Sequence, residues 1–423
     1  MNIVMVGPFG LRPKGTMSAR ALPLARALAA RGHRVCLVLP PWNFPEDSGR
    51  TQLDAGVQIT NIKLPPRVPG LAHLLITWRL MRATMAEKPD VVHCFKPKAY
   101  AGLAAFVLWL GRLLHLTHVR LVVDSDDWEG RGGWNEIEPY SHLQRGFFAW
   151  QEQWGLTHAD AITVASRTLQ AMVWSLGFPP QRTFYIPNGS AGRNAPPTVW
   201  SATTPIVATG GTASTPTVAA PAPDAMPALW SATTPIVANE GTPTVLLYTR
   251  FFEFKLERAV AIVQGIVKAA PAAHVLVVGA GLHGEERAFL SHVDAAGLSA
   301  HVTYTGWLDP SELPAYFAAA QVAIYPFDDT LVNRTKCAVK LIDLLSAGVP
   351  VVADRVGQNA EYIEHGVSGI LVEPGDTAEF VAWVVRLVND ATMRDSLGEN
   401  ARRRMSDRFR WDDLAGRLED AYK

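Results

Sequence analysis

The chain has 423 residues, of which 48% are hydrophobic, enough for two or three globular domains with complete cores. Lysine plus arginine and aspartate plus glutamate number 39 each, and this balance excludes the general attraction to nucleic acid that a basic chain would have. Cys36, Cys94 and Cys337 are far apart and have no metal-binding spacing. We therefore expect a reduced, cytoplasmic protein.

The first expected strand, residues 2–6, runs directly into a glycine-rich turn, which is typical of a core strand rather than a signal peptide. The most apolar long run, residues 99–116, contains Arg112 and His115. It falls short of the roughly 20 apolar residues that a membrane-spanning helix needs. The sequence therefore predicts a buried helix or one at a membrane surface.

A basic and apolar pattern surrounds Trp78, where Arg67, Arg79 and Arg82 lie near several leucines. Such a pattern fits a solvated helix over a core, and it also fits a basic amphipathic helix that touches lipid. We leave open a peripheral contact with the inner face of the membrane.

Short β-rich runs alternate with helical patterns through the first half of the chain. The helix expected at residues 19–30 ends at Gly32, as a helix C-terminus should. The expected strands are residues 2–6, 34–39, 90–94, 119–123 and 161–164. This alternation predicts a parallel sheet with helices on both faces, and residues 1–190 are expected to form a first Rossmann-like domain.

A low-complexity insertion is expected at residues 191–243. Between residues 194 and 239 the only charged residue is Asp224, and Pro, Thr and Ala dominate. The stretch WSATTPIVA at residues 200–208 recurs unchanged at residues 230–238. Two copies are too few for a solenoid, so we expect an extended or disordered segment between two domains.

The strand–helix pattern restarts after the insertion and predicts a second Rossmann-like domain at residues 244–405. The expected strands are residues 244–248, 274–278, 302–304, 322–325, 349–352 and 370–372. Open α/β sheets bind ligands at the carboxyl ends of their strands, so two facing domains of this kind would enclose a binding cleft.

Two pairs of residues in the second domain indicate a nucleotide diphosphate. Arg250 follows a strand and Lys255 precedes the next helix, where cations and helix N–H groups can hold phosphate together. An exposed loop with two ordinary basic residues is the alternative. Lys340 and Asp343 lie one helical turn apart on one face, where they offer a cation for phosphate and an acceptor for ribose hydroxyls.

The glycines of the segment VLVVGAGLHGEE form the pattern G-x-G-x-x-G at Gly279, Gly281 and Gly284. In a dinucleotide-binding enzyme an acidic residue ends the following strand, but HVTYTG ends without one. The glycines therefore indicate a close approach of backbone to a nucleotide phosphate rather than an NAD site.

These features in order resemble the family 4 glycosyltransferases of the GT-B fold, and the resemblance runs along nearly the whole chain except the insertion. LPLARALAARGHRVCLVLP resembles the first helix and second strand of that family, and FYIPNG resembles its interdomain strand. YTGWLDPSELPAYFAAAQVAIYPF and GVPVVADRVGQNAEYIEHGVSGILVEPGD match its most recognisable run. FRWDDLAGRLEDAYK resembles a C-terminal helix that crosses back to the first domain, which we place within residues 406–423.

The resemblance implies that Arg250 and Lys255 hold the donor diphosphate and that Gly10, Gly15 and Thr16 form a loop near donor and acceptor. The family's paired glutamates are altered, because the second falls on Asp343 and the first on Thr335. NRTKCAVK resembles a variant in which Lys340 serves the donor. In that variant the backbone N–H groups of Cys337, Ala338 and Val339 would lie near the sugar or the phosphate.

The first domain is expected to bind the acceptor, with Gly10, Lys14, Asp124 and His93 as candidate residues. Asp124 and Asp126 form an Asp-x-Asp pattern, which binds a metal in the other glycosyltransferase fold, but that fold has a single nucleotide domain. Asp126 or Asp127 is instead expected to bind acceptor hydroxyls or to touch the reacting sugar. His93 is more typical of a packed strand residue and ranks below the aspartates.

The resemblance thus implies a retaining hexosyltransferase that uses a nucleotide-sugar donor and a hydroxyl acceptor, without a metal or another cofactor. Two alternatives remain open, a nucleotide-sugar epimerase of the same fold and a non-catalytic protein that binds nucleotide sugars. The sequence identifies neither the base, the sugar, the acceptor nor the oligomeric state.

Overall fold

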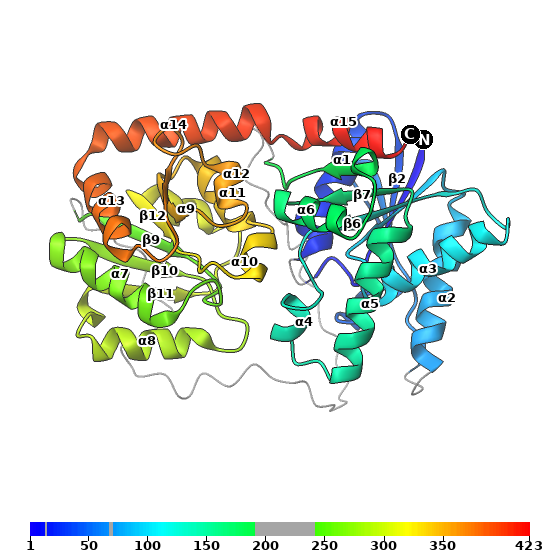
Figure 1. The fold of residues 1–423 in the computed structure, drawn as a ribbon, viewed down its shortest axis with the longest axis horizontal. Coiled ribbons are helices and arrows are strands. Elements are labelled where there is room, and N and C mark those ends of the chain that lie inside the picture. Colours follow the sequence, from blue (N-terminus) through cyan, green and yellow to red (C-terminus); the bar gives the residue numbers. More distant parts are fainter. Residues whose placement is uncertain (13–14, 67–70, 191–241) are drawn as a thin grey trace, which may run out of the picture.

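The computed structural model describes residues 1–12, 15–66, 71–190 and 242–423. In these residues the chain forms two α/β domains side by side, and the last helices return from the second domain to the first (Figure 1). The two-domain GT-B architecture is therefore confirmed. The predicted insertion, residues 191–243, lies outside the described residues except for its last two, and Lys14 and Arg67 also lie outside them.

The sheet of the first domain has the strand order β3-β4-β2-β1-β5-β6-β7-β8. Every pair of neighbours is parallel except β3 and β4. The strands are β1 (Asn2–Val6), β2 (Arg34–Leu39), β3 (Thr51–Asp54), β4 (Val57–Asn61), β5 (Val91–Phe95), β6 (Arg120–Ser125), β7 (Ala161–Val164) and β8 (Thr183–Tyr185). The order reverses between β1 and β5, so a ligand is expected at the carboxyl ends of these two strands.

The antiparallel hairpin of β3 and β4 was not predicted. Its turn consists of Ala55 and Gly56, whose φ angles of 46° and 84° are those of a tight hairpin turn. Such turns usually carry Asn-Gly or Asp-Gly, and with Ala55 in the first position the sequence lacks this usual indication of a hairpin. The exposed edge strand β3 has no apolar alternation to reveal it.

The helices of the first domain cover both faces of its sheet. The helix predicted at residues 19–30 begins earlier, with a π-helical turn at Met17–Ala21, and continues as α1 (Leu22–Ala30). The remaining helices are α2 (Leu71–Ala86), α3 (Ala99–Leu113), α4 (Trp134–Ile137), α5 (His142–His158) and α6 (Arg167–Ser175).

The second domain has a fully parallel sheet of strand order β11-β10-β9-β12-β13-β14. Its strands are β9 (Thr244–Tyr248), β10 (His274–Val278), β11 (Val302–Gly306), β12 (Val322–Tyr325), β13 (Val351–Asp354) and β14 (Ile370–Val372). Its helices are α7 (Leu256–Ala269), α8 (Glu285–Ala295), α9 (Leu313–Ala319), α10 (Leu331–Thr335), α11 (Val339–Ala347), α12 (Asn359–Tyr362) and α13 (Thr377–Asn389). Here the order reverses between β9 and β12, which places the segment after Tyr248 at the expected ligand site.

Two helices complete the chain, α14 (Ala391–Arg408) along the second domain and α15 (Trp411–Ala421) beside α1 of the first (Figure 1). Leu414, Leu418 and Tyr422 are buried in the core that α1 forms with the first sheet. At the crossing point Ser190 pairs with Arg410 in an isolated parallel bridge.

Candidate active site

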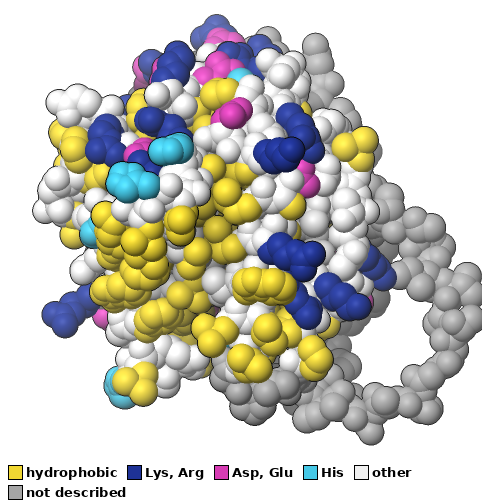
Figure 2. Space-filling view, turned by 90° about the vertical axis from the view of Figure 1, so that its right-hand side faces the viewer, with side chains coloured by type: hydrophobic (Ala, Val, Ile, Leu, Met, Phe, Trp, Pro, Cys, Tyr) yellow, Lys and Arg dark blue, Asp and Glu magenta, His cyan; other side chains and the backbone are white. Residues whose placement is uncertain are grey.

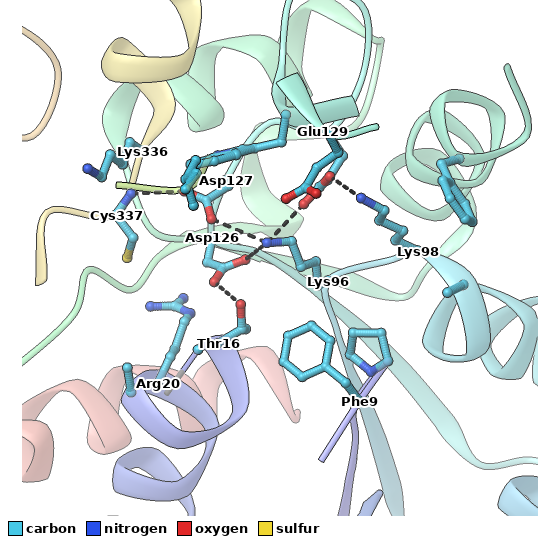
Figure 3. Close-up of a pocket in the computed structure, with 18 of the residues that line it drawn as sticks. Phe9, Thr16, Arg20, Lys96, Lys98, Asp126, Asp127, Glu129, Lys336 and Cys337 are labelled. Carbon is cyan, nitrogen blue, oxygen red and sulfur yellow. Dashed lines mark hydrogen bonds and ion pairs between the residues drawn. The ribbon is translucent and has the colours of Figure 1, made fainter. Parts of the chain in front are cut away.

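A cavity of about 1020 Å³ lies between the two domains and is lined by residues from both (Figure 3). The first domain contributes residues that follow β1, β5 and β6, and the second contributes residues that follow β9 and precede α11. The carboxyl ends of both parallel sheets therefore face one space, as the reversal of strand order in each sheet requires.

The wall of the second domain is cationic. Arg250, Lys336 and Lys340 line the cavity, together with the carboxylate of Asp343 one turn beyond Lys340. The buried Nε of Arg250 has no hydrogen-bond partner among the described residues. Because a buried donor without a partner is costly, this guanidinium is suited to an anion that the protein itself does not supply.

Lys340 lies in the first turn of α11, with its Nζ 3.7 Å from the centre of the Tyr248 ring. Burial lowers the pKa of Lys340 to about 7, and Lys336 and Arg250 add to this lowering while Glu253 and Asp343 oppose it. Lys340 is therefore only partly protonated at neutral pH in the free protein. A bound diphosphate would favour its charged form.

Lys336 is a site residue that the sequence analysis missed. Its Nζ forms an ion pair with the buried Glu253 and lies 4.3 Å from the centre of the Phe252 ring. Lys336 stands in the segment NRTKCAVK, where it is one of two lysines and only Lys340 was singled out. Glu253, which also accepts from the backbone N–H of Arg250, fixes the loop after β9.

Lys255 does not line the cavity. It is the exposed N-cap residue of α7, and its backbone N–H donates to Asp328 at 2.8 Å. Gly279 and Gly281 do not line it either, although Leu282 of the same loop does. Gly279 has a φ of 124°, and a Cβ there would lie 2.0 Å from the carbonyl oxygen of Thr249. This glycine is thus required by the close approach of two backbone segments.

The wall of the first domain is a network of opposite charges (Figure 3). Lys96 Nζ lies 2.8 Å from Glu129 Oε1, 3.3 Å from Asp127 Oδ2 and 4.0 Å from Asp126 Oδ1. Burial alone would lower the pKa of Lys96, but these three carboxylates raise it well above its ordinary value. Lys98 Nζ reaches the other oxygen of Glu129 at 2.6 Å.

Within this network Asp126 and Asp127 differ. Thr16 Oγ1 donates to Asp126 Oδ2 at 2.6 Å, while the buried Oδ1 of Asp126 has no hydrogen-bond partner among the described residues. Burial raises the pKa of Asp127, and Lys96 opposes this shift. Asp126 Oδ1 thus has Lys96 as an ionic neighbour at 4.0 Å but accepts no hydrogen bond from the described residues, and Asp126 lines the cavity beside Gly15 and Thr16.

Asp124 and His93 lie beneath the cavity and do not line it. Arg20 binds both oxygens of Asp124, at 2.8 and 2.6 Å, and Thr163 donates to the same carboxylate. His93 lies between the hydroxyls of Tyr422 and Thr163, and burial lowers its pKa well below its ordinary value. Both side chains are thus engaged by the protein itself.

Gly10 packs against Pro41 and lies outside the cavity lining. Thr335 is buried, and its hydroxyl donates to the carbonyls of Leu331 and Val332 in α10. It presents no polar group to the cavity in place of the glutamate that the family resemblance implies.

The segment before α11 is held by three protein acceptors. The N–H groups of Cys337, Ala338 and Val339 donate to Asp127, to Gln358 and to the carbonyl of Cys337. Cys337 and Val339 line the cavity, and Ala338 does not. A ligand that uses these N–H groups must therefore replace protein acceptors.

The cavity has a second, apolar part that the sequence analysis did not find. Aromatic side chains from α4 and α5 and the residues between these helices line it, together with residues of α2 and α3. They include Trp134, Tyr140, Phe147, Phe148, Leu74 and Leu103. Their only signal in the sequence is helical spacing, which equally predicts an ordinary core.

Comparisons with known proteins agree with this arrangement. Residues 15–189 match the model of a glycosyl transferase 4-like domain, and residues 242–390 match that of the glycosyl transferases group 1. The GDP-mannose-dependent alpha-(1-6)-phosphatidylinositol monomannoside mannosyltransferase of Mycobacterium tuberculosis is 29% identical over 187 residues. That alignment covers 42% of this chain and 46% of the relative, so it spans less than half of that protein.

Two solved structures share the fold over almost their whole length. Sucrose-phosphate synthase from Thermosynechococcus elongatus superposes with a TM-score of 0.68 at 19% identity, covering 100% of this chain and 98% of the other. HepE from Anabaena in complex with UDP-glucose has a TM-score of 0.64 at 16% identity, covering 99% and 98%. With one family model on each of its two domains, the chain belongs to the family 4 glycosyltransferases, which have the GT-B fold.

Proposed function

We propose that the protein is a retaining glycosyltransferase that moves a sugar from a nucleotide diphosphate donor to a hydroxyl acceptor. One observation carries the proposal. Arg250, Lys336 and Lys340 line one cavity together with Asp126, whose buried Oδ1 accepts no hydrogen bond from the described residues. The printed names of the relatives support a nucleotide-sugar donor, GDP-mannose for the mycobacterial enzyme and UDP-glucose for HepE.

In this proposal the diphosphate binds between Arg250 and Lys340. The bond from the sugar's anomeric carbon to the phosphate oxygen breaks, and charge develops on the departing diphosphate. Arg250 and the protonated form of Lys340 stabilise that charge. Asp343, one turn from Lys340, accepts from the ribose hydroxyls. Lys255, exposed at the start of α7, reaches the phosphates only after its side chain turns toward the cavity.

The acceptor is proposed to bind against the first domain. One acceptor hydroxyl donates to Oδ1 of Asp126, and a second, reacting hydroxyl attacks the anomeric carbon on the face that the diphosphate leaves, so configuration is retained. The acceptor's proton passes to the departing phosphate oxygen, and no enzyme nucleophile is required. Asp127 and Lys96 hold Asp126 in place through the charge network.

We propose that this reaction needs no metal. In this proposal Arg250 and the protonated form of Lys340 offset the charge of the diphosphate. Among the described residues no group of three or more His, Cys, Asp or Glu side chains is placed to hold a metal ion.

Screening the purified chain against nucleotide sugars by thermal shift identifies the donor, since a ligand that binds the native state raises the melting temperature. The donor found is then incubated with candidate acceptors, and the anomeric configuration of the product is read by NMR. An inverted product would contradict the proposed stereochemistry.

A non-catalytic nucleotide-sugar-binding protein is the second candidate, because Thr335 leaves the place of the first glutamate without a polar group. Donor binding without transfer to any acceptor would favour it. An epimer formed from the donor alone would instead favour a nucleotide-sugar epimerase.

A further inference from the structure

Exposed apolar side chains form a stripe on each of three helices of the first domain. On α2 the stripe is Leu71, Leu74 and Trp78. On α3 and just beyond it the stripe is Val107, Leu110, Leu113 and Leu114, and on α5 it is Leu143, Phe147 and Trp150. Each stripe follows the three- and four-residue spacing of one helix face, so these side chains point the same way along their helix.

The three stripes adjoin because α3 packs against both α2 and α5. Aromatic contacts join α3 to α5, with the Phe106 ring 5.1 Å from Trp154 and 6.1 Å from Trp150, centre to centre. Phe147 stacks on Trp150 within α5. Figure 2 shows hydrophobic side chains gathered on this side of the molecule, with basic side chains next to them. Patches of this kind on a folded protein mark a docking surface.

The charge on this surface has one sign. Residues 71–86 and 99–120 contain no aspartate or glutamate, and the only acidic residue of α5, Glu152, is buried. Arg82 is exposed, and its guanidinium lies 5.5 Å from the centre of the Trp78 ring. Arg112 does not add to the positive charge of this surface, because it forms an ion pair with Asp160.

The same surface reaches the mouth of the active-site cavity. Leu74 is 67% exposed and Phe147 is 42% exposed, and both also line the cavity. The apolar part of the cavity therefore continues into the exposed stripes of α2 and α5 through these two residues.

We propose that this surface of α2, α3 and α5, the three-helix face, docks on a membrane that contains anionic lipids. Exposed leucines and tryptophans at the boundary between water and lipid, with arginine beside them, are the chemistry of an interfacial contact. A second copy of the chain fits this face less well. An isologous contact would bring arginine toward arginine with no carboxylate between them. As a consequence that rests on the proposed function, the acceptor is a lipid-borne hydroxyl compound that enters the cavity from the bilayer.

Flotation of the full chain with vesicles tests the docking. We expect the chain to float with vesicles of phosphatidylcholine and phosphatidylglycerol, and several-fold less with phosphatidylcholine alone or at high salt, because exposed charges are screened. The triple variant Trp78→Ser, Leu110→Ser, Leu113→Ser should lose about tenfold or more of this binding, since its apolar contact area is removed. Arg82→Glu should lower binding to the anionic vesicles alone.

The matched controls are Leu53→Ser on β3 and Trp174→Ser on α6, which are exposed residues of the same types on other elements. They should float as the unaltered chain does. Thermal shift with nucleotide sugars, measured on every variant, shows whether the fold and the donor site are intact, so the docking and the proposed function are tested separately. Equal flotation of the triple variant, or no flotation of the unaltered chain, overturns the proposal. A concentration-dependent dimer that the triple substitution abolishes would assign the face to a second copy instead.

Discussion

The carboxylate of Asp127, just beyond β6, accepts a hydrogen bond from the backbone N–H of Cys337, two residues before α11, at 3.1 Å. This bond joins the two domains across the cavity, at a place where the start of a helix favours an anion. A protein carboxylate thus occupies one donor that a phosphate or sugar oxygen of the substrate could use.

Asp127→Asn is therefore expected to bind the nucleotide diphosphate about tenfold more tightly, because a neutral amide no longer repels the phosphates or competes as strongly for the N–H group. Transfer should nevertheless slow, since Lys96 loses a partner and the charge network around Asp126 is disturbed. Calorimetry with the nucleotide diphosphate and steady-state kinetics measure the two effects. Asp395→Asn, an exposed change on α14, is the control, and unchanged nucleotide affinity in Asp127→Asn would refute the competition.

Arg250→Ala should lower kcat/KM ten- to hundredfold while leaving the melting temperature nearly unchanged, because a hydrogen bond to a charged group contributes about 1.5–3 kcal/mol. Lys255→Ala should also lower transfer, but less, because its side chain lies outside the cavity in the free protein. Lys268→Ala on the opposite end of α7 controls for the loss of a surface lysine. An Arg250→Ala enzyme as active as the unaltered one would exclude Arg250 from the diphosphate site.

Donor affinity is expected to fall as pH rises from 6 to 9. Below its pKa of about 7, Lys340 is a cation that can hold phosphate, and above that value the free protein must take up a proton to do so. Lys340→Met should bind the donor weakly and lose this part of the pH dependence. Binding measured across the pH range for both forms checks this, and an identical slope in both would contradict it.

Lys340 also makes the stability of the free protein depend on pH, but stability rises with pH whereas donor affinity falls. Its pKa falls from the ordinary 10.5 to about 7 on folding, so the unfolded chain binds the proton more tightly. Its contribution to the free energy of unfolding therefore becomes more favourable as pH rises from 7 toward 10.5, and the destabilisation is complete below 7. Lys340→Met should raise the melting temperature of the free protein at pH 7 and should do so less at pH 10. A variant that melts lower at pH 7 would show that the packing of Lys340 on Tyr248 outweighs its burial cost.

Transfer should persist in EDTA, because the proposed stabilisation of the diphosphate uses Arg250 and Lys340. Rates with and without chelator, before and after adding Mg²⁺ or Mn²⁺, measure this. Complete loss in EDTA with recovery on adding either metal would return the Asp124–Asp126 pattern to consideration as a metal site.

Sequence reasoning reached the architecture because strand–helix alternation is a strong signal. It grouped Arg250, which follows a strand, with Lys340 and Asp343, one turn apart on a helix, and all three line the cavity. It could not place Lys255 and Asp124, because exposure and buried pairing depend on contacts far apart in the chain. Arg20, which engages Asp124, lies 104 positions away. The ion pairs of Lys96 with Asp127 and Glu129 were not predicted for the same reason, since they join the segments after β5 and β6.

The return of α15 to the first domain has a consequence for synthesis of the chain. Leu414, Leu418 and Tyr422 complete a core that includes residues of β1, α1 and β2. The first domain therefore cannot bury that core until the second domain has been translated, and part of its apolar surface stays exposed in the meantime. During that interval the nascent first domain should depend on chaperones.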